Sequence, residues 1–148
     1  MFHQLMNFLK TPEAKPPADL KVAVAVLLIE AAFRDDTFAP EERAAIARIL
    51  QRNFGLTKEE ASQLLALAEG RVREMVQLHP YTHAIFEQML PEERIGFIEM
   101  LWEVAYADGT LDPEEDAMIR KIAGLIYVED RDRMLARQRV LKRMKGEG

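Results

Sequence analysis

Apolar residues along this chain recur at intervals of three and four, the spacing of one face of an α-helix. The run that ends near Phe33 shows the pattern with Leu20, Val24, Leu27 and Leu28. No run alternates between apolar and polar residues with a period of two, as a half-buried strand would. We therefore expect an all-α protein of seven to eight helices.

Prolines, glycines and capping residues set the predicted boundaries. Pro40, Pro91 and Pro113 fit the first position of a helix, where a missing N–H costs nothing, and Gly55 fits a C-terminal cap. The pair His79-Pro80 is expected to break the chain between two helices. The predicted helices cover about residues 1–10, 19–33, 40–54, 57–78, 81–89, 91–106, 113–127 and 131–143.

One segment of the chain occurs twice. Residues 30–42 recur 73 positions later as residues 103–115, and no gap is needed to align them. Each copy reads as a helix, a turn and a second helix. Because two copies of a hairpin usually pack about a pseudo-twofold axis, we expect two pseudo-symmetric helix–turn–helix halves packed as one bundle, with their turns near one another.

Carboxylates crowd both turns. Each copy has a Glu, an Asp five residues later and a Glu seven residues after that: Glu30, Asp35 and Glu42 in the first copy, and Glu103, Asp108 and Glu115 in the second. Like charges this close repel, and either a bound cation or raised pKa values relieve the repulsion. Hard divalent ions such as Ca²⁺ prefer oxygen ligands. The full spacing of an EF-hand loop is absent, which excludes that family.

Helix capping is the competing interpretation of these carboxylates. Asp112 fits an N-cap with Glu115 completing a capping box, and Glu42 complements the dipole of its helix. Capping accounts less well for Asp35 and Asp108, which precede the N-cap positions. Both interpretations stay open, and these two aspartates are the strongest candidates for ion ligands.

Composition narrows the class of protein. With 148 residues and a hydrophobic fraction of 49%, the chain suits one globular domain. The absence of cysteine excludes thiol chemistry and cysteine-ligated zinc. No apolar run reaches the roughly 20 residues that a membrane-spanning helix needs, and no signal peptide is evident. We therefore expect a cytoplasmic protein without a transmembrane segment.

The net charge of −5 is unevenly distributed. Residues 131–148 carry seven Lys or Arg against two acidic residues, a net +5, so the remainder carries −10. An acidic body argues against nucleic-acid binding, which needs clustered cations. The basic tail either rests as a solvated helix against an acidic neighbour or binds something anionic.

The chain shows no catalytic constellation. It has no glycine-rich phosphate loop and no nucleophile motif. His79 and His83 are four residues apart, a spacing that binds zinc on a helix, but Pro80 argues against one helix across both. Trp102 and the eight methionines fit apolar core positions. We expect no enzymatic activity, no catalytic residue and no organic cofactor.

The second copy, Tyr106-Ala107-Asp108-Gly109-Thr110-Leu111-Asp112-Pro113-Glu114-Glu115, resembles the acidic turn of the tellurite-resistance TerB-like family. The resemblance covers about residues 20–127. The first copy departs from it, because Asp36 replaces the glycine and Ala39 stands where the second copy has Asp112. A similar domain precedes the J-domain of a membrane-anchored co-chaperone, but this chain shows neither the anchor nor a J-domain.

The resemblance implies an all-helical metal-binding module for sensing or scaffolding in the stress response to tellurite. It implies a divalent ion, calcium or another. By position, the ligands would be Asp35, Glu42, Asp108 and Glu115, supported by Glu30 and Glu103. We expect a TerB-like domain over residues 19–148, preceded by an amphipathic helix and Pro-rich linker over residues 1–18.

Three functions stay open at this point. The first is a non-enzymatic adaptor that holds an ion and binds protein partners. The second is a metal-dependent hydrolase that uses the carboxylate cluster. The third is a structural interaction bundle in which the carboxylates only cap helices.

Overall fold

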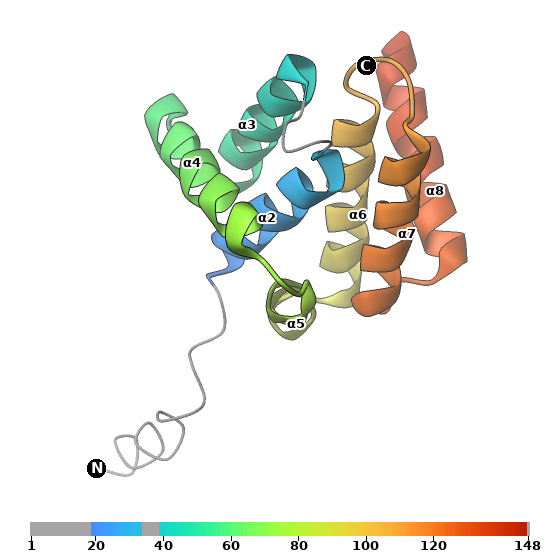
Figure 1. Cartoon of the computed structure of the whole chain (residues 1–148). Helices are drawn as coiled ribbons and strands as arrows, with labels where there is room; N and C mark the ends of the chain where they lie inside the picture. Colours follow the sequence, from blue (N-terminus) through green and yellow to red (C-terminus); the bar gives the residue numbers. More distant parts are fainter. Residues whose placement is uncertain (1–18, 34–38, 148) are drawn as a thin grey trace.

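The computed structural model describes residues 19–33 and 39–147, and within them every regular element is helical. The predicted all-α fold is confirmed. The N-terminal segment 1–18, with its predicted helix and linker, lies outside the described residues, as does most of the first acidic turn. Within the two described ranges, seven α-helices form a single bundle (Figure 1), and the last of them continues into a short π-helical turn. They are α2 (Leu20–Ala32), α3 (Pro40–Phe54), α4 (Lys58–Glu74), α5 (His79–Gln88), α6 (Pro91–Ala105), α7 (Pro113–Leu125), α8 (Asp130–Lys142) and η1 (Arg143–Glu147).

Helix α2 is the centre of the bundle. It packs against α3, α4, α5, α6 and α7 (Figure 1), and ten of its thirteen residues are buried. Its N-cap is Asp19, whose side chain accepts a hydrogen bond from the Lys21 backbone N–H at 2.8 Å. A helix that is apolar on all faces must be enclosed on all faces, and the surrounding helices provide that enclosure.

The predicted boundaries of α3 and of the start of α4 are confirmed. Pro40 is the first residue of α3, and Gly55 ends it in the left-handed conformation with φ 62°. Thr57 and Glu60 form a capping box at this start: the Thr57 N–H donates to the Glu60 carboxylate at 2.9 Å, and the Glu60 N–H donates to the Thr57 hydroxyl at 3.0 Å.

The boundary between α4 and α5 differs from the prediction. Helix α4 ends at Glu74, four residues early, and Met75 is extended with ψ 132°. Helix α5 begins at His79, so the chain breaks before His79-Pro80 and not at it. Pro80 lies in the first turn of α5, where no intrahelical partner is required for its nitrogen. Pro80 therefore belongs to the start of a helix, and the predicted break at His79-Pro80 is wrong.

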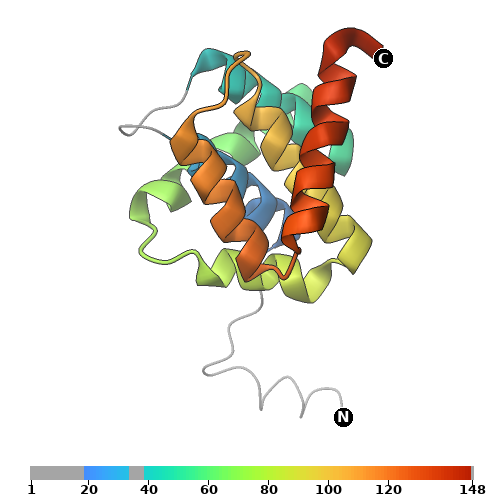
Figure 2. The same ribbon diagram turned by 90° about the vertical axis from the view of Figure 1, so that its right-hand side faces the viewer.

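Helix α8 packs along α6 and α7 (Figure 2). The fully buried Trp102 of α6 donates its indole N–H to the Arg133 backbone carbonyl at 3.0 Å. On the same side, Arg139 and Arg143 donate to the two carboxylate oxygens of Glu99 at 2.7 and 3.0 Å. The prediction that the basic tail rests against an acidic neighbour is confirmed for these two arginines.

Candidate metal site at the acidic turns

The two predicted ligands in the first turns of α3 and α7 are buried. Glu42 is 5% exposed and Glu115 is 3% exposed, and they are the two buried carboxylates of the described residues. They occupy the same position in the two copies of the repeat, the third residue of each helix and two positions after its proline. The first helical turn presents backbone N–H groups and the positive end of the helix dipole, which stabilise a carboxylate there.

Glu42 has a local role in addition to its burial. The Ala39 backbone N–H donates to the Glu42 carboxylate at 3.1 Å. Ala39 is the N-cap residue but has no hydrogen-bonding side chain, so Glu42 supplies the one half of a capping box that this helix can form. The capping interpretation therefore accounts for part of what Glu42 does.

The N-cap of α7 is Asp112, as predicted. Its carboxylate accepts a hydrogen bond from the Glu114 backbone N–H at 2.7 Å. The bond goes to the second residue of the helix, whereas a capping box would engage the third, Glu115. The burial of Glu115 is therefore not explained by Asp112 alone.

Asp108 is exposed and shapes its own turn. Its Oδ1 accepts hydrogen bonds from the Thr110 backbone N–H at 3.1 Å and from the Thr110 hydroxyl at 3.5 Å. Gly109, between them, has φ 94°, a conformation that glycine adopts without strain. This is an Asx-turn, which gives Asp108 a structural role that the spacing argument had not identified. Asp35, its counterpart, lies outside the described residues.

The two supporting glutamates lie near residues of other helices. Glu103 on α6 forms an ion pair with Arg52 on α3, with N–O distances of 3.0 and 3.4 Å. Glu30 on α2 lines a cavity of about 430 Å³ together with Lys121 and Leu125 of α7. Glu103 therefore contacts the second helix of the other copy directly, whereas Glu30 shares a cavity with residues of α7 and of the segment 75–79.

In the structure, the residues predicted as metal ligands form only part of a metal centre. Among the described residues, no three His, Asp or Glu side chains gather as metal ligands would. The second turn contributes the buried Glu115 and the exposed Asp108, and the first contributes Glu42. The turn between α6 and α7 and the first turn of α3 lie at the same end of the molecule (Figures 1 and 2).

His79 and His83 share one helix, contrary to the expectation that Pro80 would separate them. Both lie on α5, and their rings stack with centroids 5.4 Å apart. His83 Nε2 is 3.8 Å from the Glu87 carboxylate one turn later. Pro80 could have predicted this arrangement, because proline is common in the first turn of a helix. A helix that begins at His79 includes both histidines.

Comparison with known proteins identifies one family. The sequence profile described as "Tellurite resistance protein TerB" matches residues 21–138, which include all the elements from α2 to most of α8. Searches of the curated proteins and of the solved structures found no significant match. Within residues 19–33 and 39–147, no helix combines the length and apolar character that crossing a membrane requires.

Proposed function

The chain belongs to the family of the tellurite resistance protein TerB, and on that premise we propose that it is a non-enzymatic binding domain that holds a divalent ion at its acidic turns. The ion, calcium or another, would adjust the surface that the domain offers to protein partners in a tellurite stress response. A cysteine-free chain suits the reducing cytoplasm, where we place this role.

The burial of Glu42 and Glu115 carries the proposal. Removing a carboxylate from water costs several kcal/mol unless hydrogen bonds or a cation compensate. Both copies of the repeat keep this arrangement at the same position, beside turns rich in further carboxylates. A cation close to these groups would offset the desolvation and the mutual repulsion at once.

The donor set favours a hard ion. All the candidate ligands are carboxylate oxygens, which Ca²⁺, Mg²⁺ and Mn²⁺ prefer. Asp108 uses Oδ1 for both hydrogen bonds to Thr110, which leaves Oδ2 for a cation. Under this proposal the Asx-turn orients Asp108, and an ion would bind without disturbing the turn.

Thermal unfolding of metal-free protein tests the proposal. An ion that binds the native state alone stabilises it by about 2.7 kcal/mol at a hundredfold excess over Kd. We expect one of Ca²⁺, Mg²⁺, Mn²⁺ or Zn²⁺ to raise the Tm of the wild type. The rise should be lost in the double variant Asp35→Asn, Asp108→Asn and reduced in Glu115→Gln.

Glu59→Gln provides the control. Glu59 is an exposed acidic residue in the first turn of α4, so this variant also removes a charge from a helix N-terminus but leaves the acidic turns intact. It should keep the full ion-dependent rise. If no ion raises the wild-type Tm, or if the double aspartate variant keeps the rise, the carboxylates are caps and surface charges.

A further inference from the structure

A basic groove runs along the hairpin of α3 and α4, on a body that is otherwise acidic. The groove has a volume of about 440 Å³. Its apolar lining includes Ala44 and Ala47 from α3 and Leu65 from α4. The cations Arg43, Arg48 and Lys58 also line it. No part of the proposed ion site requires these residues.

Helical geometry explains why the groove exists. Ala44, Ala47 and Gln51 recur at intervals of three and four along α3, so they share one face. Lys58, Ser62 and Leu65 do the same on α4. Small side chains on the α3 face leave space between the two helices, and Leu65, which is 4% exposed, closes the bottom.

The charges of the groove are only partly compensated by the protein itself. Arg43 pairs with Glu69 of α4. Within the described part of the chain, neither Arg48 nor Lys58 takes part in an ion pair. Lys58 is the first residue of α4, where a cation opposes the helix dipole. The positive end of the α4 dipole and the Lys58 ammonium group therefore both attract an anion to the end of the groove where α4 begins.

We propose that this groove binds an acidic amphipathic helix of a partner protein. The groove extends from Pro40 to Gln51, about 16 Å of helix at 1.5 Å per residue, which is enough for three turns of a bound helix. Small apolar side chains of the partner would fit over Ala44, Ala47 and Leu65, and its carboxylates would meet Arg48 and Lys58. This is the helix-in-groove mode of recognition, with charge selecting the partner.

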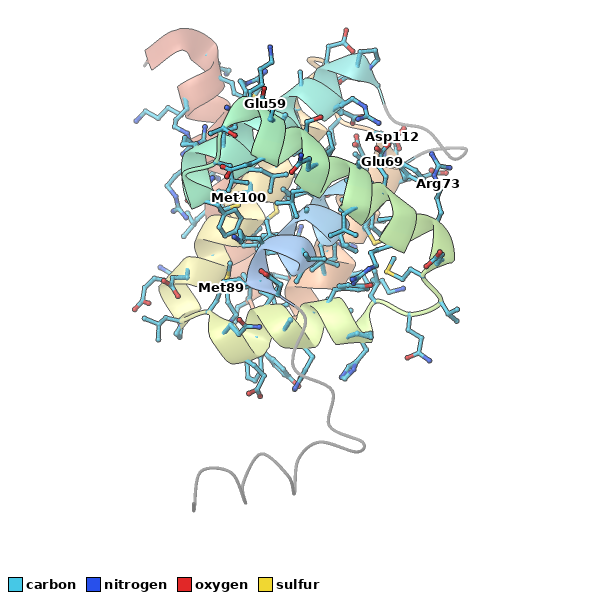
Figure 3. The ribbon with its side chains drawn as sticks, turned by 90° about the vertical axis from the view of Figure 1, so that its left-hand side faces the viewer. Glu59, Glu69, Arg73, Met89, Met100 and Asp112 are labelled. Carbon is cyan, nitrogen blue, oxygen red and sulfur yellow. The ribbon has the colours of Figure 1, made fainter. Side chains whose placement is uncertain are left out.

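The groove is open to a partner from outside the bundle. Figure 3 faces the outer side of α4, with Glu59 near the beginning of the helix and Arg73 near its end. Arg48 and Lys58 are exposed, and Ala44 beside them is exposed as well. A partner helix would lie along the hairpin without any movement of α3 or α4.

An NMR titration of the full chain tests the proposal. The probe is an acetylated peptide of about 18 residues, with Leu and Ala on one helical face and Glu elsewhere. We expect it to shift the backbone amide signals of Ala44, Ala47 and Ser62. A second peptide with Lys in place of every Glu should leave these signals unchanged.

Charge-reversal variants make the test specific. In the double variant Arg48→Glu, Lys58→Glu, binding of the acidic peptide should weaken at least about tenfold. The control Arg120→Glu reverses an exposed arginine on α7, outside the groove, and should bind as the wild type does. Because all three positions are exposed, the variants should fold, and well-dispersed spectra would verify this.

Several results would overturn the proposal. These are an absence of shifts at saturating peptide, shifts centred on another surface such as α8, equal binding of the lysine peptide, or unchanged affinity in the double variant. Single-stranded DNA is titrated in parallel. If it shifts the same amides and the acidic peptide does not, the groove is a nucleic-acid site and the proposed partner is wrong.

Discussion

Trp102 shows how a single residue fastens α8 to α6. Its ring is fully buried, and its N–H donates to the Arg133 carbonyl on α8. Arg137 lies over the rings of Trp102 and Tyr106, with its guanidinium carbon 5.8 and 5.7 Å from their centroids. Arg137 also donates to the Tyr106 hydroxyl at 2.7 Å. Trp102 of α6 and Tyr106, which follows this helix, therefore both contribute to the attachment of α8.

Trp102→Phe should destabilise the protein by roughly 1–3 kcal/mol, because it removes the hydrogen bond to Arg133 and part of the buried volume. Urea unfolding followed by circular dichroism measures this. Tyr106→Phe, which removes only the hydroxyl that Arg137 contacts, should cost less than about 1 kcal/mol. If both variants lose the same free energy of unfolding, the buried indole and its hydrogen bond to Arg133 do not stabilise the protein as described.

Sequence reasoning was accurate for residues whose role is local and incomplete for those whose role depends on distant partners. The Asp19 and Asp112 caps, the Thr57 capping box and the Gly55 terminus were all predictable from neighbours within a few positions. The ion pair of Glu103 with Arg52 was not, because the two residues are 51 positions apart. Asp108 was identified as a candidate ligand, but its Asx-turn with Thr110 was missed.

At the scale of elements, glycines serve two different purposes. Gly55 ends α3 with φ 62°, a conformation that costs other residues about 1–2 kcal/mol. Gly70 lies within α4, is exposed and has open space where a Cβ would be. Only the first of these positions requires glycine.

Alanine substitution should therefore have opposite effects at the two positions. Gly55→Ala should lower the free energy of unfolding by about 1 kcal/mol through backbone strain. Gly70→Ala should raise it by about 0.5–1 kcal/mol through helix propensity. Chemical denaturation of both variants measures the difference, and a loss of stability in Gly70→Ala would show that the helix needs its glycine.

The boundary between α4 and α5 shows where element prediction was limited. The helical pattern of α4 continued past Gly70 toward Leu78, so periodicity gave no reason to stop at Glu74. The chain is extended at Met75, and Met75 and Leu78 pack against the core from the connecting segment. The helix therefore ends at Glu74 because of tertiary packing. The periodicity of the sequence contains no information about that packing.

At the scale of the whole molecule, α2 ties the α3–α4 pair and the α6–α7 pair into one cooperative unit. It packs against α3 and α4 on one side and against α6 and α7 on the other. Neither pair can keep its buried face without α2, so the two should not unfold separately. Small single domains of this kind usually unfold in one transition.

The single tryptophan provides a direct check. Trp102 reports on α6 and α8, whereas circular dichroism reports on all the helices. Both signals should give the same denaturation midpoint. A fluorescence transition at a different denaturant concentration would show that α6 and α8 unfold independently of the α3–α4 pair.

The central position of α2 also has a consequence for biosynthesis. The ribosome produces this apolar helix before α6, its partner on the far side of the core, which is complete only at residue 105. At 5–20 residues per second, about 4–15 s pass between the end of α2 and the end of α6. During that interval the nascent chain carries an uncovered hydrophobic segment, so α2 is the segment that a ribosome-associated chaperone would bind first.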